Sequence, residues 1–243
     1  MKQAKKLLHT VLSISGFVPA HMTLLRAVFM FGSVLASVLI LPSYQNLSFS
    51  IGYFLCSTVA YIGFIFFVLP ERGFRLKMIE KFGEQKAYLY FEAFLAFAFF
   101  HNGISLSFIS QSSADNDLFG QLPAGMALAF AVVLFTIGTV VKIWLAYVVG
   151  TPIYYWKDMF LGKKVCDFVV TGPYKYFNNP MYGLGQLQVY AVAIYYHSVY
   201  GLIFGVINQG LVFLFYFMVE KPFIQRTYLQ QEAPTFIHTH QRA

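Results

Sequence analysis

Two stretches of this 243-residue chain combine aromatic rings, turns and a carboxylate in patterns that could support chemistry. Residues 150–182 are aromatic, basic and rich in turn-forming residues, and residues 219–223 read Val-Glu-Lys-Pro-Phe. Pro180 is predicted to open a helix at its first turn, where backbone N–H groups without an intrahelical partner can receive an anion. Asn179, directly before it, could take part in such a site or could serve only as the helix N-cap.

The side chains of these stretches suit a cationic ligand. Glu220 could hold an ammonium group, take a proton, or simply pair with a nearby lysine. Aromatic faces hold a cation or stack on another ring for about 0.5–2 kcal/mol each. Four tyrosines of the first stretch could do this, or could belong to the aromatic belt of a membrane interface: Tyr154, Tyr174, Tyr176 and Tyr182.

Apolar segments long enough to cross a bilayer must position these groups. The chain is 58% hydrophobic and 11% charged, which is too little charge to cover a soluble domain of this size. A hydrocarbon core of about 30 Å needs about 20 helical residues. We therefore predict an all-α, polytopic membrane bundle of about six transmembrane helices with a C-terminal helical hairpin. The expected spans are 24–41, 49–69, 88–109 and 124–149, followed by the region 181–219, which Tyr196-His197-Ser198 would divide into the two helices of the hairpin.

Charge placement predicts the orientation of these spans. Lys and Arg gather at the N-terminus, in 70–87, in 150–180 and in the tail, whereas 42–48, 110–123 and the tip of the hairpin contain none. By the positive-inside rule, both termini and the two reactive stretches are expected on the cytosolic side, of a bacterial inner membrane or of the endoplasmic reticulum. The net charge of +7 is then explained by membrane loops, and no nucleic-acid partner is expected. Residues 71–87 could form a helix on the leaflet surface or an ordinary solvated loop.

Two ionisable residues fall inside spans. Glu92 and Lys142 would each cost about 2.5–3.5 kcal/mol near the middle of the membrane, so such residues usually pair or serve a function. They could approach each other or share a polar cavity, or each could extend to the interface. The two cysteines and six histidines show no metal-ligand spacing, so no metal site is expected.

The two reactive stretches together resemble a known signature. Gly172-Pro173-Tyr174 followed by Asn179-Pro180-Met181-Tyr182 is similar to that of integral-membrane methyltransferases, which include the phospholipid N-methyltransferases and the isoprenylcysteine carboxyl methyltransferases. Asn-Pro-Met-Tyr and the later Glu-x-Pro-Phe look closest to the phosphatidylethanolamine N-methyltransferases, whereas the isoprenylcysteine enzymes usually show Arg-His-Pro. Gly150-Thr151 resembles the glycine-containing cofactor segment of the phospholipid enzymes.

The sequence departs from that pattern at two places. The family usually has a glycine two residues after the signature tyrosine, where this chain has Leu184 between Gly183 and Gly185. Paired glutamates are common where this chain has Glu220-Lys221. The first departure bears on the local cofactor geometry, and the second bears on the substrate.

The resemblance implies S-adenosylmethionine as methyl donor and a membrane lipid as acceptor, most simply the ethanolamine headgroup of a phospholipid. It implies one membrane domain over residues 1–243, with N-terminal spans in 1–123 and a cofactor-binding methyltransferase core in 124–231. The catalytic residues would be Glu220, Asn179 and Tyr182. The cofactor-binding residues would be Gly150, Thr151, Tyr154, Gly172, Pro173, Tyr174, Tyr176, Asn179, Pro180, Met181, Tyr182, Gly183 and Glu220.

Three other functions stay open at this point. A carboxyl O-methyltransferase of a prenylated or other lipid acid would use the same donor. A sterol-type membrane reductase shares a similar C-terminal helical region but would use a nicotinamide cofactor. A non-enzymatic transporter or scaffold would bind no cofactor.

Overall fold

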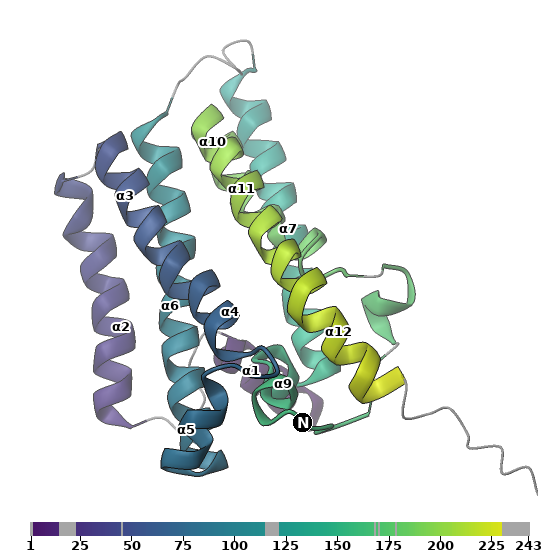
Figure 1. Cartoon of the computed structure of the whole chain (residues 1–243). Coiled ribbons are helices and arrows are strands. Elements are labelled where there is room, and N and C mark those ends of the chain that lie inside the picture. Colours follow the sequence, from purple (N-terminus) through teal and green to yellow (C-terminus); the bar gives the residue numbers. More distant parts are fainter. Residues whose placement is uncertain are drawn as a thin grey trace, which may run out of the picture.

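The structure, a computed structural model, describes residues 2–14, 23–44, 46–114, 122–167, 169, 171–177 and 179–229. Every regular element among these residues is helical, as predicted (Figure 1). The longer helices are α1 (Lys2–Ile14), α2 (Leu24–Leu39), α3 (Leu47–Thr58), α5 (Arg75–Phe82), α6 (Glu84–Ser112), α7 (Ala124–Val149), α10 (Leu187–Tyr195) and α11 (Val199–Phe215). Shorter elements are α4 (Phe64–Val68), α8 (Thr151–Tyr154), α9 (Lys157–Leu161), α12 (Lys221–Ile224), the 3₁₀ turns η2 (Leu41–Tyr44), η4 (Gly172–Lys175) and η5 (Leu184–Gln186), and the π-helical turns η3 (Val59–Gly63), η6 (Tyr216–Glu220) and η7 (Gln225–Leu229).

Five helices of the described chain are long and apolar enough to cross a membrane. Large apolar side chains such as Val133, Phe135 and Phe217 lie exposed on their outer faces, as expected of a surface in contact with lipid. The predicted all-α polytopic bundle is thus confirmed. The five helical stretches are Arg26–Ser43, Leu47–Val68, Glu84–Ser112, Ala124–Val149 and Val199–Leu229.

Side-chain caps explain where three of the helices begin. The Thr23 hydroxyl accepts a hydrogen bond from the backbone N–H of Arg26, and the Asn46 side chain accepts one from Phe49. The Ser198 hydroxyl does the same for Gly201 at the start of α11. Each cap satisfies a donor that the first turn of a helix leaves without a partner.

The C-terminal hairpin forms, but its two helices are unequal. The predicted interruption is confirmed, because α10 ends at Tyr195 and His197 has a left-handed backbone with φ of 51°. Helix α10 has nine residues and rises about 14 Å, which is about half of the hydrocarbon core. The final helix runs on to Leu229, beyond the predicted end at residue 219, because π-helical turns carry it past Pro222.

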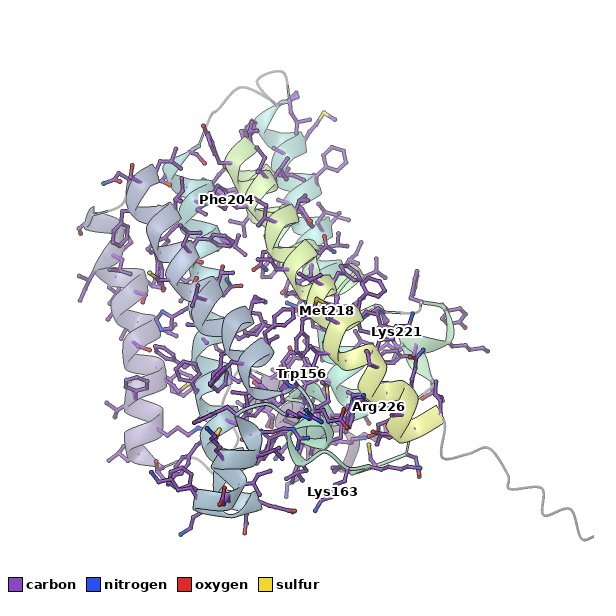
Figure 2. The ribbon with its side chains drawn as sticks, viewed as in Figure 1. Trp156, Lys163, Phe204, Met218, Lys221 and Arg226 are labelled. Carbon is purple, nitrogen blue, oxygen red and sulfur yellow. The ribbon has the colours of Figure 1, made fainter. Side chains whose placement is uncertain are left out.

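The basic segments gather at one end of the bundle. In Figure 1 the helices α1, α5 and α9 lie at the lower end, where α12 also ends. Figure 2 shows the labelled side chains of Lys163, Lys221 and Arg226 toward this end and Phe204 toward the other. Residues 75–82 form a helix, as one of the two alternatives predicted, and its position on a leaflet stays a prediction.

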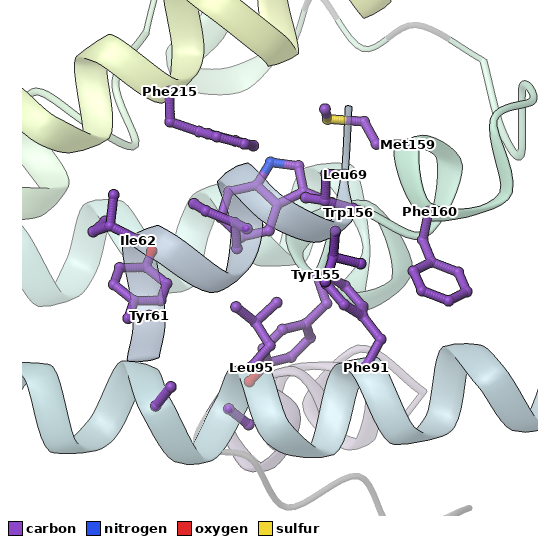
Figure 3. Packing of buried hydrophobic residues seen from close by; sticks show 14 of the residues in the cluster. Tyr61, Ile62, Leu69, Phe91, Leu95, Tyr155, Trp156, Met159, Phe160 and Phe215 are labelled. Carbon is purple, nitrogen blue, oxygen red and sulfur yellow. The ribbon is translucent and has the colours of Figure 1, made fainter. Parts of the chain in front are cut away.

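The main core lies at the same end and packs around an aromatic centre. Figure 3 shows Trp156 beside Phe215, with Leu69, Tyr155 and Phe160 close by. The Trp156 and Phe215 rings meet edge to face, with centroids 5.4 Å apart. This packing joins the loop after α7 to the last helix.

The two charges inside the membrane have separate partners. The Arg26 guanidinium lies 3.6 Å from the Glu92 carboxylate, to which the Tyr88 hydroxyl also donates. Lys142 donates to the Gln188 side-chain carbonyl at 3.1 Å. The alternative in which Glu92 and Lys142 approach each other is therefore wrong. Helix α10 packs against both α6 and α7, and this packing gives Lys142 a partner on α10.

Candidate active site

A cavity of about 260 Å³ lies at the basic end of the bundle, between the loop that follows α7 and the end of the last helix. Ligand pockets in proteins start at about this size. Its wall combines apolar and aromatic side chains with a few polar groups. The lining residues are Val149, Ile153, Tyr154, Trp156, Asp158, Met159, Cys166, Asp167, Val169, Tyr174, Asn179, Met181, Tyr182, Tyr216, Glu220, Lys221, Phe223, Ile224, Gln225, Tyr228 and Leu229.

Tyr182 and Glu220 meet in this wall although 38 residues separate them. The Tyr182 hydroxyl donates to Glu220 Oε2 at 2.5 Å, and the indole of Trp156 also interacts with this carboxylate. The Gln209 side chain donates to the backbone carbonyl of Tyr182 at 2.8 Å. Tyr182 is thus fixed at both ends by the last helix, so the two reactive stretches lie side by side, as the sequence predicts.

Pro222 explains the local helix geometry at Glu220. A proline inside a helix has no N–H to donate to the carbonyl four residues earlier. The described chain takes up the mismatch in the π-helical turn η6, which contains Glu220. Such turns are rare, widen the helix and occur frequently at functional sites.

The cavity carries more negative than positive charge. The carboxyl groups of Asp158, Asp167 and Glu220 line it, against the single ammonium of Lys221 among its described lining residues. Burial raises the pKa of Asp158, and hydrogen bonds from the Tyr228 hydroxyl and the Met159 N–H partly offset that effect. The arrangement favours a cation held near tyrosine faces.

The tyrosines of the wall stay neutral. Burial raises the pKa of Tyr154 to about 12. Burial and then the nearby Glu220 carboxylate raise the pKa of Tyr174 above its usual value. At neutral pH these side chains therefore offer hydroxyl groups and ring faces to a ligand.

The structure brings six of the predicted site residues into the wall and keeps the others behind it. Tyr176 is 71% exposed and is not among the lining residues, and its contact with a cofactor stays a prediction. The residues in the wall are Tyr154, Tyr174, Asn179, Met181, Tyr182 and Glu220. Those outside it are Gly150, Thr151, Gly172, Pro173, Tyr176, Pro180 and Gly183.

Two of the glycines outside the wall shape the backbone that carries the tyrosines. Gly150 ends α7 with φ of +82°, and Gly172 begins the turn of Tyr174 with φ of +64°. Residues with a side chain rarely adopt such angles. A Cβ on Gly172 would also lie 3.3 Å from Trp144 Nε1, so glycine lets this turn pack closely on α7.

The turn around Pro180 differs from the predicted helix start. Helix α10 begins at Leu187, and Pro180 lies in an irregular turn before η5. The Asn179 side chain accepts from the Tyr182 N–H at 3.4 Å, and the Asn179 carbonyl accepts from the Gly183 N–H at 3.1 Å. These two amides are engaged within the turn, so the predicted helix start at Pro180 is wrong, whereas an anion site on the amides near Asn179–Met181 stays a prediction.

Sequence reasoning missed three wall residues: Asp158, Trp156 and Tyr228. Asp158 is 6% exposed, and its carboxylate accepts from the Tyr228 hydroxyl at 2.8 Å. One signal was present, since an aspartate stands among the lysines of the loop after α7. Tyr228 lies beyond the predicted end of the last helix and gave no signal of its own.

Five bilayer-length helices with a cavity at the basic end make this chain a polytopic membrane protein. Residues 126–231 match the family model described as phospholipid methyltransferase, and this match confirms the resemblance. This region contains every lining residue of the cavity and all but the first two residues of α7, and it is similar to the phospholipid methyltransferase family. The comparisons with curated proteins and with solved structures found no match.

Proposed function

We propose that this protein is an S-adenosylmethionine-dependent membrane methyltransferase that N-methylates the ethanolamine headgroup of a phospholipid. The observation that carries the proposal is the Tyr182–Glu220 hydrogen bond in the wall of an acidic, aromatic cavity within the family region. The domain division, with the methyltransferase core in 124–231, is part of the same proposal.

The chemistry of the cavity fits the donor. S-adenosylmethionine carries a sulfonium and an ammonium cation, one carboxylate and an adenine ring, and it supplies an electrophilic methyl group when bound. The ring faces of Tyr154, Tyr174 and Tyr182 would receive the adenine or the sulfonium. The Asp158 carboxylate would hold the ammonium or the ribose hydroxyls.

Glu220 would act as the base. A lipid ammonium must lose a proton before its nitrogen can form a bond to carbon, and a positioned carboxylate is the natural acceptor of that proton. The Tyr182 hydroxyl fixes the orientation of the Glu220 carboxylate. The rest of the contribution would be positioning and exclusion of water by the aromatic wall.

We propose that this site lies at the cytosolic leaflet, because the loops on its side of the bundle are the ones rich in Lys and Arg. The donor would enter from the cytosol, and the lipid would enter sideways between helices. This arrangement keeps the soluble and the apolar substrate in their own phases until they meet.

Lipid analysis tests the substrate. The chain would be expressed in a cell that lacks methylated phospholipids, and the lipids would be measured by mass spectrometry. New mono-, di- or trimethylated ethanolamine lipids are expected. Donor binding without such lipids would favour the O-methyltransferase alternative, and absence of donor binding would contradict the proposed activity altogether.

A thiol assay tests the donor site separately. Cys166 is exposed and lines the cavity, whereas Cys56 lies in the second span. In a Cys56→Ser background, bound S-adenosylmethionine should slow alkylation of Cys166 at concentrations near its dissociation constant. Adenosine monophosphate at the same concentration is a control for non-specific shielding.

A further inference from the structure

Two further cavities lie between the active-site cavity and the interior of the helix bundle. A small cavity of about 30 Å³ shares Tyr154, Trp156 and Tyr182 with the active-site cavity. It also shares Lys142 and Gln186 with a third cavity of about 290 Å³. Shared walls mean that the three are neighbours along one path, with the small cavity, about the size of one or two water molecules, in the middle.

The third cavity has a mainly apolar wall but carries three buried polar groups at a depth where lipid tails lie. It is enclosed by α6, α7, α10 and α11, and its polar residues include Lys142, Gln188 and Asn208. Phe135, which is 50% exposed on the outer face of α7, also lines it, so the cavity reaches the lipid-facing surface. The three neighbouring cavities therefore form a row between the lipid-facing surface and the proposed active site.

Two groups in this cavity point to a ligand. The Asn208 side chain is 4% exposed, and its Oδ1 atom is buried without a hydrogen-bond partner. Lys142 donates to the neutral Gln188 side chain at 3.1 Å, and its ammonium has no carboxylate within 4.0 Å among the described residues. Buried polar groups and charges are normally compensated, so a group supplied from outside is expected here.

The depth of Lys142 suits a lipid headgroup. Lys142 lies seven residues before the end of α7 at Val149, which is about 10 Å along the helix. A lipid drawn inward by this amount keeps its tails in the hydrocarbon core while its headgroup leaves the interface. The ligand is then expected to be an anion attached to a lipid rather than a free one.

The charges along the path match a zwitterion. Lys142 supplies a cation at the inner end, and Glu220 and Asp158 supply carboxylates at the other. An ethanolamine phospholipid carries its phosphate anion and its ammonium cation on either side of a two-carbon arm. The narrow middle cavity, between Tyr61, Phe99 and Tyr182, has room for such an arm but not for a second headgroup.

We propose that the Lys142 cavity binds the phosphate group of the acceptor lipid, with its amine directed through the middle cavity toward Glu220. Gln188 holds Lys142 in place, and its own amide is held by the Thr139 hydroxyl at 2.7 Å. The Asn208 Oδ1 atom accepts a hydrogen bond from a water molecule bound together with the headgroup. This inference rests on the proposed function, because it assigns the acceptor of the same site.

The test compares two acceptors with the purified full chain in detergent. One is dioctanoyl phosphatidylethanolamine, and the other is an alkoxyethylamine, which has the same amine arm but no phosphate. Lys142→Met should raise KM for the phospholipid about tenfold or more, because a charge-assisted contact to phosphate is lost. KM for the alkoxyethylamine and the dissociation constant of S-adenosylmethionine should not change. Lys142→Arg should recover part of the loss, and Lys77→Met, on the exposed face of α5, is the matched control.

A binding measurement separates this proposal from the proposed function. Dioctanoyl phosphatidylmethanol has the phosphate but no amine, and it should raise Tm of the protein but not of Lys142→Met. If the protein methylates neither amine, the proposed function fails, and the stabilisation by phosphatidylmethanol alone decides whether the phosphate site exists.

Equal KM values for the phospholipid in the protein and in Lys142→Met, or equal stabilisation of both by phosphatidylmethanol, would overturn the site. If Lys142→Met does not fold, Gln188→Leu makes the same comparison, because it removes the side chain that holds the Lys142 ammonium in place.

Discussion

At the scale of single residues, the hydrogen bond between Tyr182 and Glu220 defines the site. It joins the signature turn to the last helix, and Gln209 holds the same tyrosine from its backbone side. A carboxylate so held is oriented before any substrate arrives. Preorganisation of this kind accelerates methyl transfer, because the reaction depends mainly on the alignment of donor and acceptor.

Removal of the Glu220 carboxylate should stop turnover without unfolding the protein. Glu220→Gln is expected to lower kcat by about 10²–10⁴, the usual contribution of a positioned base. Methyl transfer from labelled donor to phosphatidylethanolamine measures this. Membrane insertion and Tm should stay close to those of the parent, and normal kcat in this variant would remove Glu220 from the mechanism.

The tyrosine of the pair should have a smaller effect. Tyr182→Phe removes a hydrogen bond to a carboxylate, worth about 1.5–3 kcal/mol, so a loss of about 10- to 100-fold in kcat/KM is expected. The same assay applies, with Tyr90→Phe, on the exposed side of α6, as control. A loss as large as that of Glu220→Gln would instead give the hydroxyl a direct role in the reaction.

Asp158 should make stability depend on pH. Burial raises the pKa of Asp158, so the folded chain binds this proton more tightly than the unfolded chain does. As pH rises from about 3.9, the unfolded value, through the raised folded value, the free energy of unfolding therefore falls. In Asp158→Asn, the part of this decrease in the free energy of unfolding that comes from Asp158 should be absent. Tm in detergent as a function of pH measures it, and parallel curves for the two proteins would contradict the assignment.

At the scale of elements, irregular backbone positions the site on regular helices. The π-helical turns η3 and η6 carry Tyr61 and Glu220, and both side chains face the path between the cavities. Gly150 and Gly172 turn the loop after α7 so that Tyr154 and Tyr174 reach the wall. At these turns the backbone departs from the regular α-helical hydrogen-bond pattern, and this departure directs the side chains toward the cavities.

Gly172 is the element-scale position most sensitive to a small change. Gly172→Ala places a side chain at φ of +64° and a Cβ 3.2 Å from Val148 Cγ2. Strain of this kind costs about 1–3 kcal/mol, and we expect lower Tm together with weaker donor binding as Tyr174 shifts. Gly125→Ala, where a Cβ meets nothing within 4 Å, is the control. Unchanged donor affinity in Gly172→Ala would show that this turn does not position the site.

At the scale of the whole molecule, the cavity of the proposed active site and the basic loop segments of the described chain gather at one end of the bundle. The lower end in Figure 1 holds α1, α5, α9 and the end of α12, and the core of Figure 3 lies there too. A donor from the aqueous phase and an acceptor from the bilayer can meet only at such a boundary. The side of the membrane on which this end lies decides which pool of donor the protein uses.

Thiol accessibility tests this orientation. In a Cys56→Ser background, an impermeant maleimide should label Cys166 in inverted membrane vesicles and not in intact cells or right-side-out vesicles. The assay is best run at mildly alkaline pH, because burial raises the pKa of the Cys166 thiol. Labelling only from the outside would reverse the proposed orientation.

The sequence alone determined the class of fold, the approximate positions of the first four spans and the meeting of two stretches at one end. Those features follow from runs of apolar residues and the placement of Lys and Arg, which act locally along the chain. Only the tertiary structure decided which helices touch. It paired Glu92 with Arg26 rather than Lys142, extended the last helix so that Tyr228 reaches Asp158, and placed α10 against α7, where it encloses the polar cavity. These outcomes depend on side-chain packing between segments far apart in the chain. Hydropathy and charge patterns carry no information about that packing.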